Sequence, residues 1–381
     1  MTAADDLPAE AWATALVSLE GMGPRRLRAL LARHPEPRSA WEAVRAGGLH
    51  RVAELAGPLG PRRVEVAATW AAQATTFDVA ERWEAHVRAG IGVVLAGRPG
   101  FPTAFAGDPD PPIVLFHLGD PDLAVGARVA IVGTRDCTRY GYDVAFELGR
   151  DLTTAGISVV SGLALGIDGA AHAGALEARA TPPVAVVGSG LDVPYPRRHA
   201  ALWRRVASQG VIWSEYPLGS AAEAWHFPAR NRLIAALADV VVVVESHQQG
   251  GALLTAEQAA LRARPVMAVP GPVRSPASAG CNQLLADSPG TSVARDATDV
   301  LVALHLEPGS RRQATERRAP PAPDDARFLE ALGWQPATLD QLAARTATSF
   351  AEASSALMRL ELDGWVVPRG GWYERVAKAD G

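Results

Sequence analysis

The 381-residue chain has only two cysteines, Cys137 and Cys281, and they lie far apart in the sequence. Two cysteines are too few for a disulfide framework or a four-cysteine zinc site, so we interpret both as free thiols. No run of 18 uninterrupted apolar residues is present, and the stretch from Met1 to Asp6 has neither a basic n-region nor an apolar core. These absences predict a protein without a membrane span, and we expect a cytoplasmic location.

Lysine is nearly absent, because Lys378 is the only lysine among the 37 basic residues. A Walker A loop requires Gly-Lys-Ser/Thr, so a P-loop is excluded, and a Schiff-base lysine in the central part of the chain is excluded as well. The net charge is −4, so any contact with nucleic acid must come from a local patch of arginines. The cysteines and histidines lack metal-ligand spacing, and we expect neither a metal nor a cofactor.

Two glycine loops follow β-branched apolar runs, Ala130-Ile-Val-Gly-Thr-Arg135 and Ser161-Gly-Leu-Ala-Leu-Gly-Ile-Asp168, and a helical pattern comes after each. This order places backbone N–H groups over a phosphate. Glycine lets a ligand approach the amides, and a Ser or Thr hydroxyl can donate a further hydrogen bond. Arg135 adds a fixed charge with forked donors, which suits a phosphodiester.

Strand and helix patterns alternate through the middle of the chain, after shorter β-rich runs at 91–95 and 113–116. The expected strands are 128–132, 157–161, 183–187, 210–214, 240–245 and 265–269. The expected helices are about 140–154, 167–179, 197–208, 229–237 and 252–262. Continuous apolar strands separated by helices of this length predict an α/β fold, a Rossmann-like parallel sheet flanked by helices.

Two smaller domains are expected beside this Rossmann-like domain, which we assign to residues 76–306. Residues 1–75 predict a small helical domain of the helix-hairpin-helix or SAM-like type, with a glycine turn at Gly21-Met-Gly-Pro24. Such a turn sometimes holds a DNA phosphate, but a simple packed hairpin is more common. Residues 307–325 are rich in proline and charge, as in a linker. Residues 326–381 show three helical patterns and a hairpin with a Gly-Gly tip, which predicts a winged-helix-like domain.

Five successive strand ends of the expected sheet carry glycine, hydroxyl or arginine groups. Each one alone is most simply a turn or a helix cap. In doubly wound sheets, however, ligands bind outside the carboxyl ends of the strands, so the convergence of these groups on one edge favours a binding site. Aromatic faces such as Tyr140, Tyr195 or Phe227 could stack bases there without reading sequence, although each is more often a core residue.

The central part of the chain, roughly residues 110–300, resembles the DNA-processing protein A family (DprA, also called Smf). The motifs that carry the resemblance in combination are Gly133-Thr-Arg135, Tyr140-Gly141, Ser161-Gly-Leu-Ala-Leu-Gly-Ile-Asp168, Ala171-His172, Gly188-Ser-Gly-Leu-Asp192, Tyr195-Pro196, Ser214-Glu-Tyr-Pro217, Phe227-Pro-Ala-Arg-Asn-Arg232 and Gly280-Cys-Asn282. The resemblance implies a single-stranded DNA-binding protein of natural transformation that protects incoming strands and loads the recombinase RecA onto them. It implies no catalysis, and it implies a homodimer formed through the C-terminal part of the domain.

By the same resemblance, Arg135 corresponds to the DNA-binding arginine of the family, and Arg197 stands where a basic residue often follows Tyr-Pro. The candidate DNA-binding residues are Gly133, Thr134, Arg135, Tyr140, Ser161, Gly162, Gly166, Asp168, Gly188, Gly190, Tyr195, Arg197, Arg230, Asn231, Arg232, Gly251, Thr255 and Asn282. Two departures from the family pattern stand out. Gly250-Gly251 replaces the usual Ser-Gly, and Ala-Asp-Ser-Pro-Gly follows Leu284-Leu285, where the dimer contact is expected.

Three other functions compete with DNA binding by the central domain. An enzyme of the phosphoribohydrolase type could use Asp168, His172 and Glu245 as acid and base groups, although its Pro-Gly-Gly-x-Gly-Thr loop is absent. A dinucleotide oxidoreductase is weakly indicated, since Gly133-Thr-Arg-Asp136 lacks the Gly-x-Gly-x-x-Gly pattern. A chromosomal regulator would place its affinity for DNA in the winged-helix-like domain instead.

Overall fold

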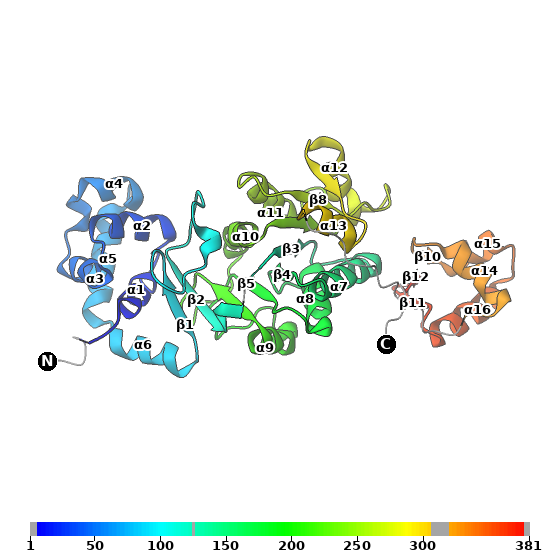
Figure 1. Cartoon of the computed structure of the whole chain (residues 1–381), viewed down its shortest axis with the longest axis horizontal. Helices are drawn as coiled ribbons and strands as arrows, with labels where there is room; N and C mark the ends of the chain where they lie inside the picture. Colours follow the sequence, from blue (N-terminus) through cyan, green and yellow to red (C-terminus); the bar gives the residue numbers. More distant parts are fainter. Residues whose placement is uncertain (1–5, 124–125, 306–319, 377–381) are drawn as a thin grey trace.

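The computed structural model describes residues 6–123, 126–305 and 320–376. Figure 1 shows three parts in a row: an N-terminal group of helices, a central sheet covered by helices, and a small C-terminal domain at the far end. No helix within these ranges has the length and apolarity needed to cross a lipid bilayer.

The N-terminal part is a group of helices joined by short glycine and proline turns. Its helices are α1 Ala9–Val17, α2 Pro24–Arg33, α3 Pro37–Ala46, α4 Ala53–Leu59, α5 Arg63–Thr76 and α6 Val79–Arg88. The turn expected between α1 and α2 is confirmed, and Gly21 adopts the left-handed φ of +69° that favours glycine there. Leu16 of α1 and Leu27 and Leu30 of α2 are buried, and the last two are three residues apart, so one apolar face of each of these two helices packs into this core.

The central sheet has nine strands in the order β1-β2-β6-β5-β4-β3-β7-β8-β9. The strands are β1 Gly92–Leu95, β2 Val114–Gly119, β3 Arg128–Val132, β4 Ser158–Ser161, β5 Val184–Val187, β6 Val211–Ser214, β7 Val240–Val243, β8 Val266–Ala268 and β9 Thr291–Val293. The strands from β6 to β9 in this order pair in parallel, as expected. The two short β-rich runs, β1 and β2, are antiparallel and form one edge.

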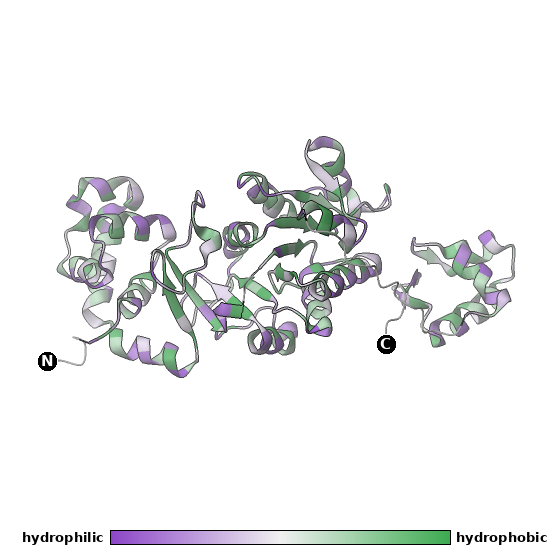
Figure 2. Ribbon diagram, viewed as in Figure 1, coloured by the Kyte–Doolittle hydropathy of each residue, from purple (hydrophilic) through white to green (hydrophobic). Residues whose placement is uncertain are grey.

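Helices cover both faces of the sheet. They are α7 Arg139–Thr154, α8 Ile167–Ala178, α9 Ala200–Gln209, α10 His226–Leu237, α11 Gly251–Ala260, α12 Ala279–Asp287 and α13 Ala297–Ala303. Apolar side chains of α7, α8 and α13 share one core with the sheet, and those of α10, α11 and α12 share another. Figure 2 shows the strands as mainly hydrophobic and the helices as mixed, as expected for a sheet buried between two layers.

The packing of α7 on α8 depends on two glycines. A β-carbon at Gly149 would meet the backbone oxygen of Ala171, and one at Gly174 would meet that of Phe146. The helices therefore approach more closely than larger residues would permit.

The C-terminal domain has the three helices and the hairpin expected of a winged helix. Its elements are α14 Pro323–Leu332, β10 Ala337–Thr338, α15 Leu339–Thr346, α16 Phe350–Leu362, β11 Val366–Arg369 and β12 Trp372–Arg375. Gly370 and Gly371 both have positive φ at the hairpin tip, the backbone that a two-residue turn of this kind requires. The expected linker, 307–325, lies mostly outside the described residues, and its last three residues already belong to α14.

Some element boundaries differ from the expectation. The helix expected at about 197–208 is divided into a short 3₁₀ turn, Arg197–His199, followed by α9. The helix expected at about 229–237 begins earlier, at His226. The edge strand β9 was not expected at all, because it has three residues and only Val293 is a large apolar side chain.

Candidate nucleic-acid interface

An open groove lies where the strand order reverses, between β3 and β7. After β3 the chain continues toward β4 on one side, and after β7 it continues toward β8 on the other side. The loops that follow β3 and β7 therefore diverge and leave a hollow between them. This hollow has a volume of about 620 Å³. A small recess of about 40 Å³ adjoins it and shares Arg135, Tyr195 and Phe227 with it. We call the hollow and its recess the groove.

The structure brings together at the groove many of the residues predicted from strand ends. Those that line it are Gly133, Thr134, Arg135, Gly162, Asp168, Gly188, Tyr195, Arg230, Asn231, Gly251 and Thr255. They come from the loops after β3, β4 and β5 and from the first turns of α8, α10 and α11.

Arg135 is the exposed cation of the groove. Its guanidinium carbon lies 4.3 Å from the ring centroid of Phe227, which is a cation–π distance. The ring of Phe227 lies 5.5 Å from that of Tyr195, and Tyr195 is 43% exposed. Arg135 forms no hydrogen bond or ion pair with any residue that the structure describes. The guanidinium is therefore positioned by an aromatic face while its N–H donors stay free for a ligand.

Arg230 and Asp168 form a buried pair beneath the groove. Their charged groups are 3.8 Å apart, and Asp168 also accepts a hydrogen bond of 3.1 Å from the backbone N–H of Gly162. Burial raises the pKa of Asp168, and the positive charge of Arg230 partly opposes that shift. Burial likewise lowers the pKa of Arg230 to about 10, so the guanidinium stays charged at neutral pH. A β-carbon at Gly162 would collide with this guanidinium, which is why glycine stands there.

Backbone groups supply further polar donors. The helix α11 begins at Gly251, which lines the groove, and no side chain caps its N-terminus, so uncapped amides and the positive end of the helix dipole lie at the groove. The side-chain amide of Asn231 donates to the carbonyl of Gly251 at 3.3 Å and ties α10 to this turn. Gly133 lies so close to Ile167 and to the carbonyl of Glu245 that a β-carbon would not fit.

The structure places several predicted residues outside the groove. The Ser161 hydroxyl donates to the Ile131 carbonyl at 2.6 Å and is fully buried, so it binds the sheet rather than a ligand. The Asn282 side chain exchanges two hydrogen bonds with the backbone of Gly271. The Tyr140 hydroxyl donates to the Pro270 carbonyl and lines a different cleft, toward the winged helix. These three side chains therefore lie away from the groove, and their contact with DNA stays a prediction.

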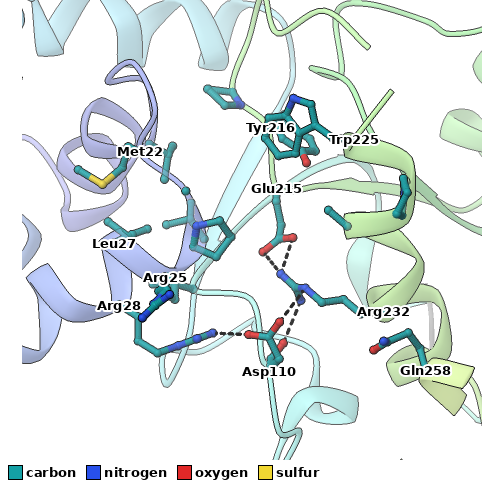
Figure 3. Close-up of a pocket in the computed structure, with 18 residues that line it drawn as sticks. Met22, Arg25, Leu27, Arg28, Asp110, Glu215, Tyr216, Trp225, Arg232 and Gln258 are labelled. Carbon is teal, nitrogen blue, oxygen red and sulfur yellow. Dashed lines mark hydrogen bonds and ion pairs between the residues drawn. The ribbon is translucent and has the colours of Figure 1, made fainter. Parts of the chain in front are cut away.

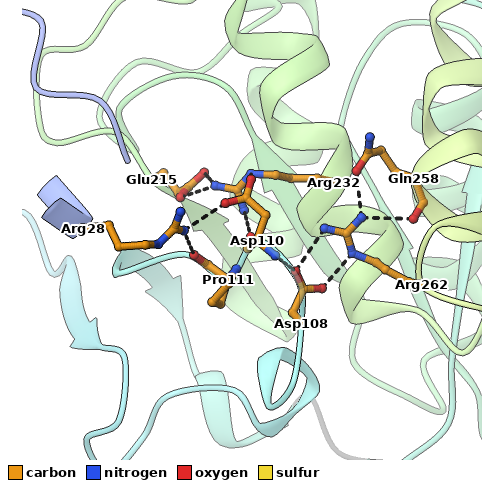
Figure 4. A network of polar contacts seen from close by, with 8 residues as sticks. All are labelled: Arg28, Asp108, Asp110, Pro111, Glu215, Arg232, Gln258 and Arg262. Carbon is orange, nitrogen blue, oxygen red and sulfur yellow. Dashed lines mark hydrogen bonds and ion pairs between the residues drawn. The ribbon is translucent and has the colours of Figure 1, made fainter. Parts of the chain in front are cut away.

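Arg232 also lies away from the groove, in an ion-pair network on the far side of α10. Its guanidinium binds both carboxylate oxygens of Glu215 at 2.6 Å and approaches Asp110 at 3.2 Å (Figure 3). Asp110 in turn pairs with Arg28 of α2 at 2.9 Å. In Figure 4 the neighbouring Asp108–Arg262 pair continues this network along the same loop.

Three more predicted residues lie beside the groove without lining it. Gly190 packs against the backbone of Pro217 and Ser220, so its role is local. Gly166 has a φ of +73° and touches the carbonyls of Thr134 and Arg135, so it supports the loop that carries Arg135. Arg197 is exposed just after Tyr195-Pro196 and has no ion pair within the described ranges.

Sequence reasoning missed the segment before α10 and the loop after β7. Ala222, Ala224, His247 and Leu254 line the groove, but alanine and leucine carry no chemical signal in a sequence. His247 follows the end of β7, where its position after an expected strand was the one available indication.

The acid and base groups of the hydrolase alternative are dispersed. His172 is fully buried, and Glu245 binds the N–H and hydroxyl of Thr138 at the start of α7, away from the groove. Asp168 lines the groove but is paired with Arg230. Nor do three histidine, cysteine or carboxylate side chains gather into a metal site anywhere in the part of the chain described.

The winged helix offers few cations to a DNA partner. The exposed face of α16 carries Phe350, Met358 and Leu362, and the guanidinium of Arg359 is paired with Asp325 at 2.6 Å. Arg369 contacts Asp136 and the carbonyl of Cys137 on the central domain. This arrangement gives little support to a regulator that binds DNA mainly through this domain.

The fold and the groove define a class: a Rossmann-like α/β protein with an arginine-bearing edge, preceded by helices and followed by a winged helix. Comparison with family models gives the family. Residues 92–305 match the model described as DNA recombination-mediator protein A, and residues 312–371 match the DprA winged helix domain. The chain belongs to the DprA/Smf family, which is a family of DNA-binding proteins that act in DNA processing and recombination.

Individual relatives agree with this assignment. Protein Smf of Synechocystis is 30% identical over 403 residues, which cover 96% of this chain and 98% of that protein. The X-ray structure of DprA from Streptococcus pneumoniae has a TM-score of 0.62 at 29% identity and covers 77% of this chain and 96% of that one. A structure of DprA from Helicobacter pylori, described for its single-stranded DNA binding mode, has a TM-score of 0.51 at 29% identity and covers 56% and 95%.

Proposed function

We propose that this protein binds single-stranded DNA in the groove and acts without catalysis, as a recombination mediator in natural transformation. The observation that carries the proposal is Arg135, an exposed guanidinium that forms no ion pair with a described carboxylate and is held over Phe227 beside Tyr195. The single-stranded DNA binding mode described for the Helicobacter pylori relative supports the same ligand.

The groove has the two components that sequence-tolerant binding of a single strand requires. Arg135 and the first amides of α11 follow the phosphates within the groove, Arg197 adds a cation beside it, and the faces of Tyr195 and Phe227 stack bases. Every base has a π-face, so stacking of this kind does not select a sequence. The buried Arg230–Asp168 pair shapes the floor and contributes little net charge.

The test is a comparison of single-stranded and duplex oligonucleotides of equal length in a gel-shift titration. We expect tighter binding of the single strand, with similar affinity for different sequences. Equal or tighter binding of the duplex contradicts the proposal, and so does cleavage of a glycosidic bond in nucleoside monophosphates.

We further propose a cytoplasmic homodimer that loads RecA onto the bound strand, as the family resemblance implies. The edge strand β9 and the loop before α12 expose Val293 and Val273, which are 44% and 90% exposed and supply an apolar surface in the C-terminal part of the central domain. Leu284 and Leu285 are half-buried against the core, so the unusual segment that follows them lies at the end of α12. Light scattering tests the dimer, and RecA strand exchange on DNA coated with single-strand-binding protein tests the loading.

A further inference from the structure

A second cavity lies between the α1–α2 hairpin and the central domain. It has a volume of about 570 Å³, within the range of small-molecule and nucleotide sites. Figure 3 shows Met22 and Leu27 of the hairpin on one side and Tyr216 and Trp225 on the other, with Glu215 and Arg232 below the two aromatic side chains.

This cavity continues the groove around the start of α10. Pro228 lines both hollows, Phe227 lines the groove, and Trp225 lines the cavity. The residues are consecutive or nearly so at the N-terminal end of one helix. A strand that leaves the groove over this end of α10 therefore arrives at the cavity.

The ring of Trp225 is fixed in place but remains 58% exposed. It packs edge-on against His226, with centroids 4.0 Å apart, and against Tyr216 at 6.2 Å. Its indole N–H donates to the Glu223 carboxylate. A large aromatic held so rigidly and left open to solvent has the form of a stacking platform for a base.

The charges in the cavity favour an anionic ligand. Glu215 is bound by Arg232, and Asp110 is bound by both Arg28 and Arg232, so the two carboxylates are compensated. Arg25, in the first turn of α2, is exposed and forms no hydrogen bond or ion pair with any described residue. Among the arginines that line the cavity, Arg25 is therefore the one whose charge is not paired with a described carboxylate.

We propose that the cavity is a second nucleotide subsite, in which Trp225 stacks a base of the bound strand and Arg25 contacts its phosphate. The inference rests on the proposed function, because the strand reaches the subsite from the groove. It assigns to the N-terminal helices a direct part in holding single-stranded DNA. The length of strand bound by one protomer then exceeds what the groove alone covers.

The test measures the affinity of the full chain for oligo-dT of about 4 to 20 nucleotides, within and beyond the usual site size of one binding domain. The variants are Trp225→Ala, Trp225→Phe and Arg25→Ala, with Arg45→Ala on α3 as the matched control, since Arg45 is also an exposed arginine of the helical domain. Melting temperatures are recorded for each variant.

We expect Trp225→Ala to weaken binding of long oligonucleotides about 5- to 150-fold, the loss of one stacked base, and to leave short ones unchanged. Trp225→Phe restores most of the affinity, and Arg25→Ala lowers the salt slope by about 0.7 for long strands alone. If Trp225→Ala and Arg25→Ala bind every length like the original chain while Arg135→Ala does not, the subsite is refuted and the groove stands. If Arg135→Ala also binds normally, the proposed function fails as well.

Discussion

Replacement of Arg135 by alanine separates a DNA contact from a structural role. The side chain is exposed and touches the ring of Phe227 at 4.3 Å, and it has no carboxylate partner in the described ranges. The fold therefore loses an exposed cation–π contact of about 0.5–1 kcal/mol. For a domain of this size that corresponds to a fall in melting temperature of about 2–4 °C or less.

The effect on DNA binding is expected to be larger. A charge-assisted hydrogen bond to a phosphate contributes about 1.5–3 kcal/mol, so Arg135→Ala should weaken binding of single-stranded DNA about 10- to 150-fold. The loss should be the same for all sequences, and the salt slope should fall by about 0.7 because one phosphate contact is removed. Arg197→Ala should behave in the same way, and Arg135→Lys should keep the slope while losing part of the affinity.

The assay is the affinity for oligo-dT across several salt concentrations, beside the melting temperature of each variant. Arg45→Ala controls for the loss of any exposed positive charge. Arg232→Ala gives the contrasting result, because it breaks a buried pair with Glu215 and should destabilise the fold by about 3–5 kcal/mol. An unchanged affinity, slope and melting temperature for Arg135→Ala and Arg197→Ala would remove both from the site and leave the backbone amides alone to bind DNA.

Three further outcomes are expected. Phe227→Ala removes both the support of Arg135 and a stacking face, so it should weaken DNA binding at least as much as Arg135→Ala does. Phe227→Trp should bind nearly as tightly as the original chain. If Phe227→Ala binds DNA as tightly as the original chain, the groove is not the DNA-binding site. Binding should persist with a chelator and without ATP, whereas a loss that zinc or magnesium reverses argues for a metal site. Burial lowers the pKa of His172 to about 3, so the folded state should lose stability as pH falls from about 6.5 toward 3, by at most about 1.4 kcal/mol per pH unit. His172→Gln should flatten this part of the curve of melting temperature against pH. An unaltered slope refutes the lowered pKa of His172.

The central fold could be predicted because several of its strands are continuous runs of β-branched apolar residues. Val240–Val243 is a continuous apolar run, and every residue in it is buried, as the parallel strands of a covered sheet require. The antiparallel direction of β1 and β2 could not be predicted, since a short β-rich run carries no sign of its pairing direction. The strand β9 could not be predicted, because two of its three residues are Thr291 and Ser292, and threonine and serine are also common in turns.

The candidate site was predictable at the level of strand ends, but not at the level of single side chains. Arg230 and Arg232 are two residues apart on α10, so they point about 200° apart around the helix. One therefore reaches Asp168 under the groove and the other reaches Glu215 behind it. Asp110, the second partner of Arg232, lies more than a hundred residues away in sequence, and no spacing indicates that pairing.

The environment of each arginine decides whether it can serve a ligand. Asp168 lies in the floor of the groove, where an uncompensated carboxylate would repel phosphates. Arg230 at 3.8 Å and the N–H of Gly162 at 3.1 Å compensate the charge of this carboxylate. Because Arg230 is paired with Asp168, its guanidinium is not available to a ligand. Arg135 rests on a ring that offers no competing acceptor, and its donors remain available. The positive potential of the groove thus comes from exposed Arg135 and the amides of α11. The buried guanidinium of Arg230 contributes indirectly, because it cancels the negative charge of Asp168.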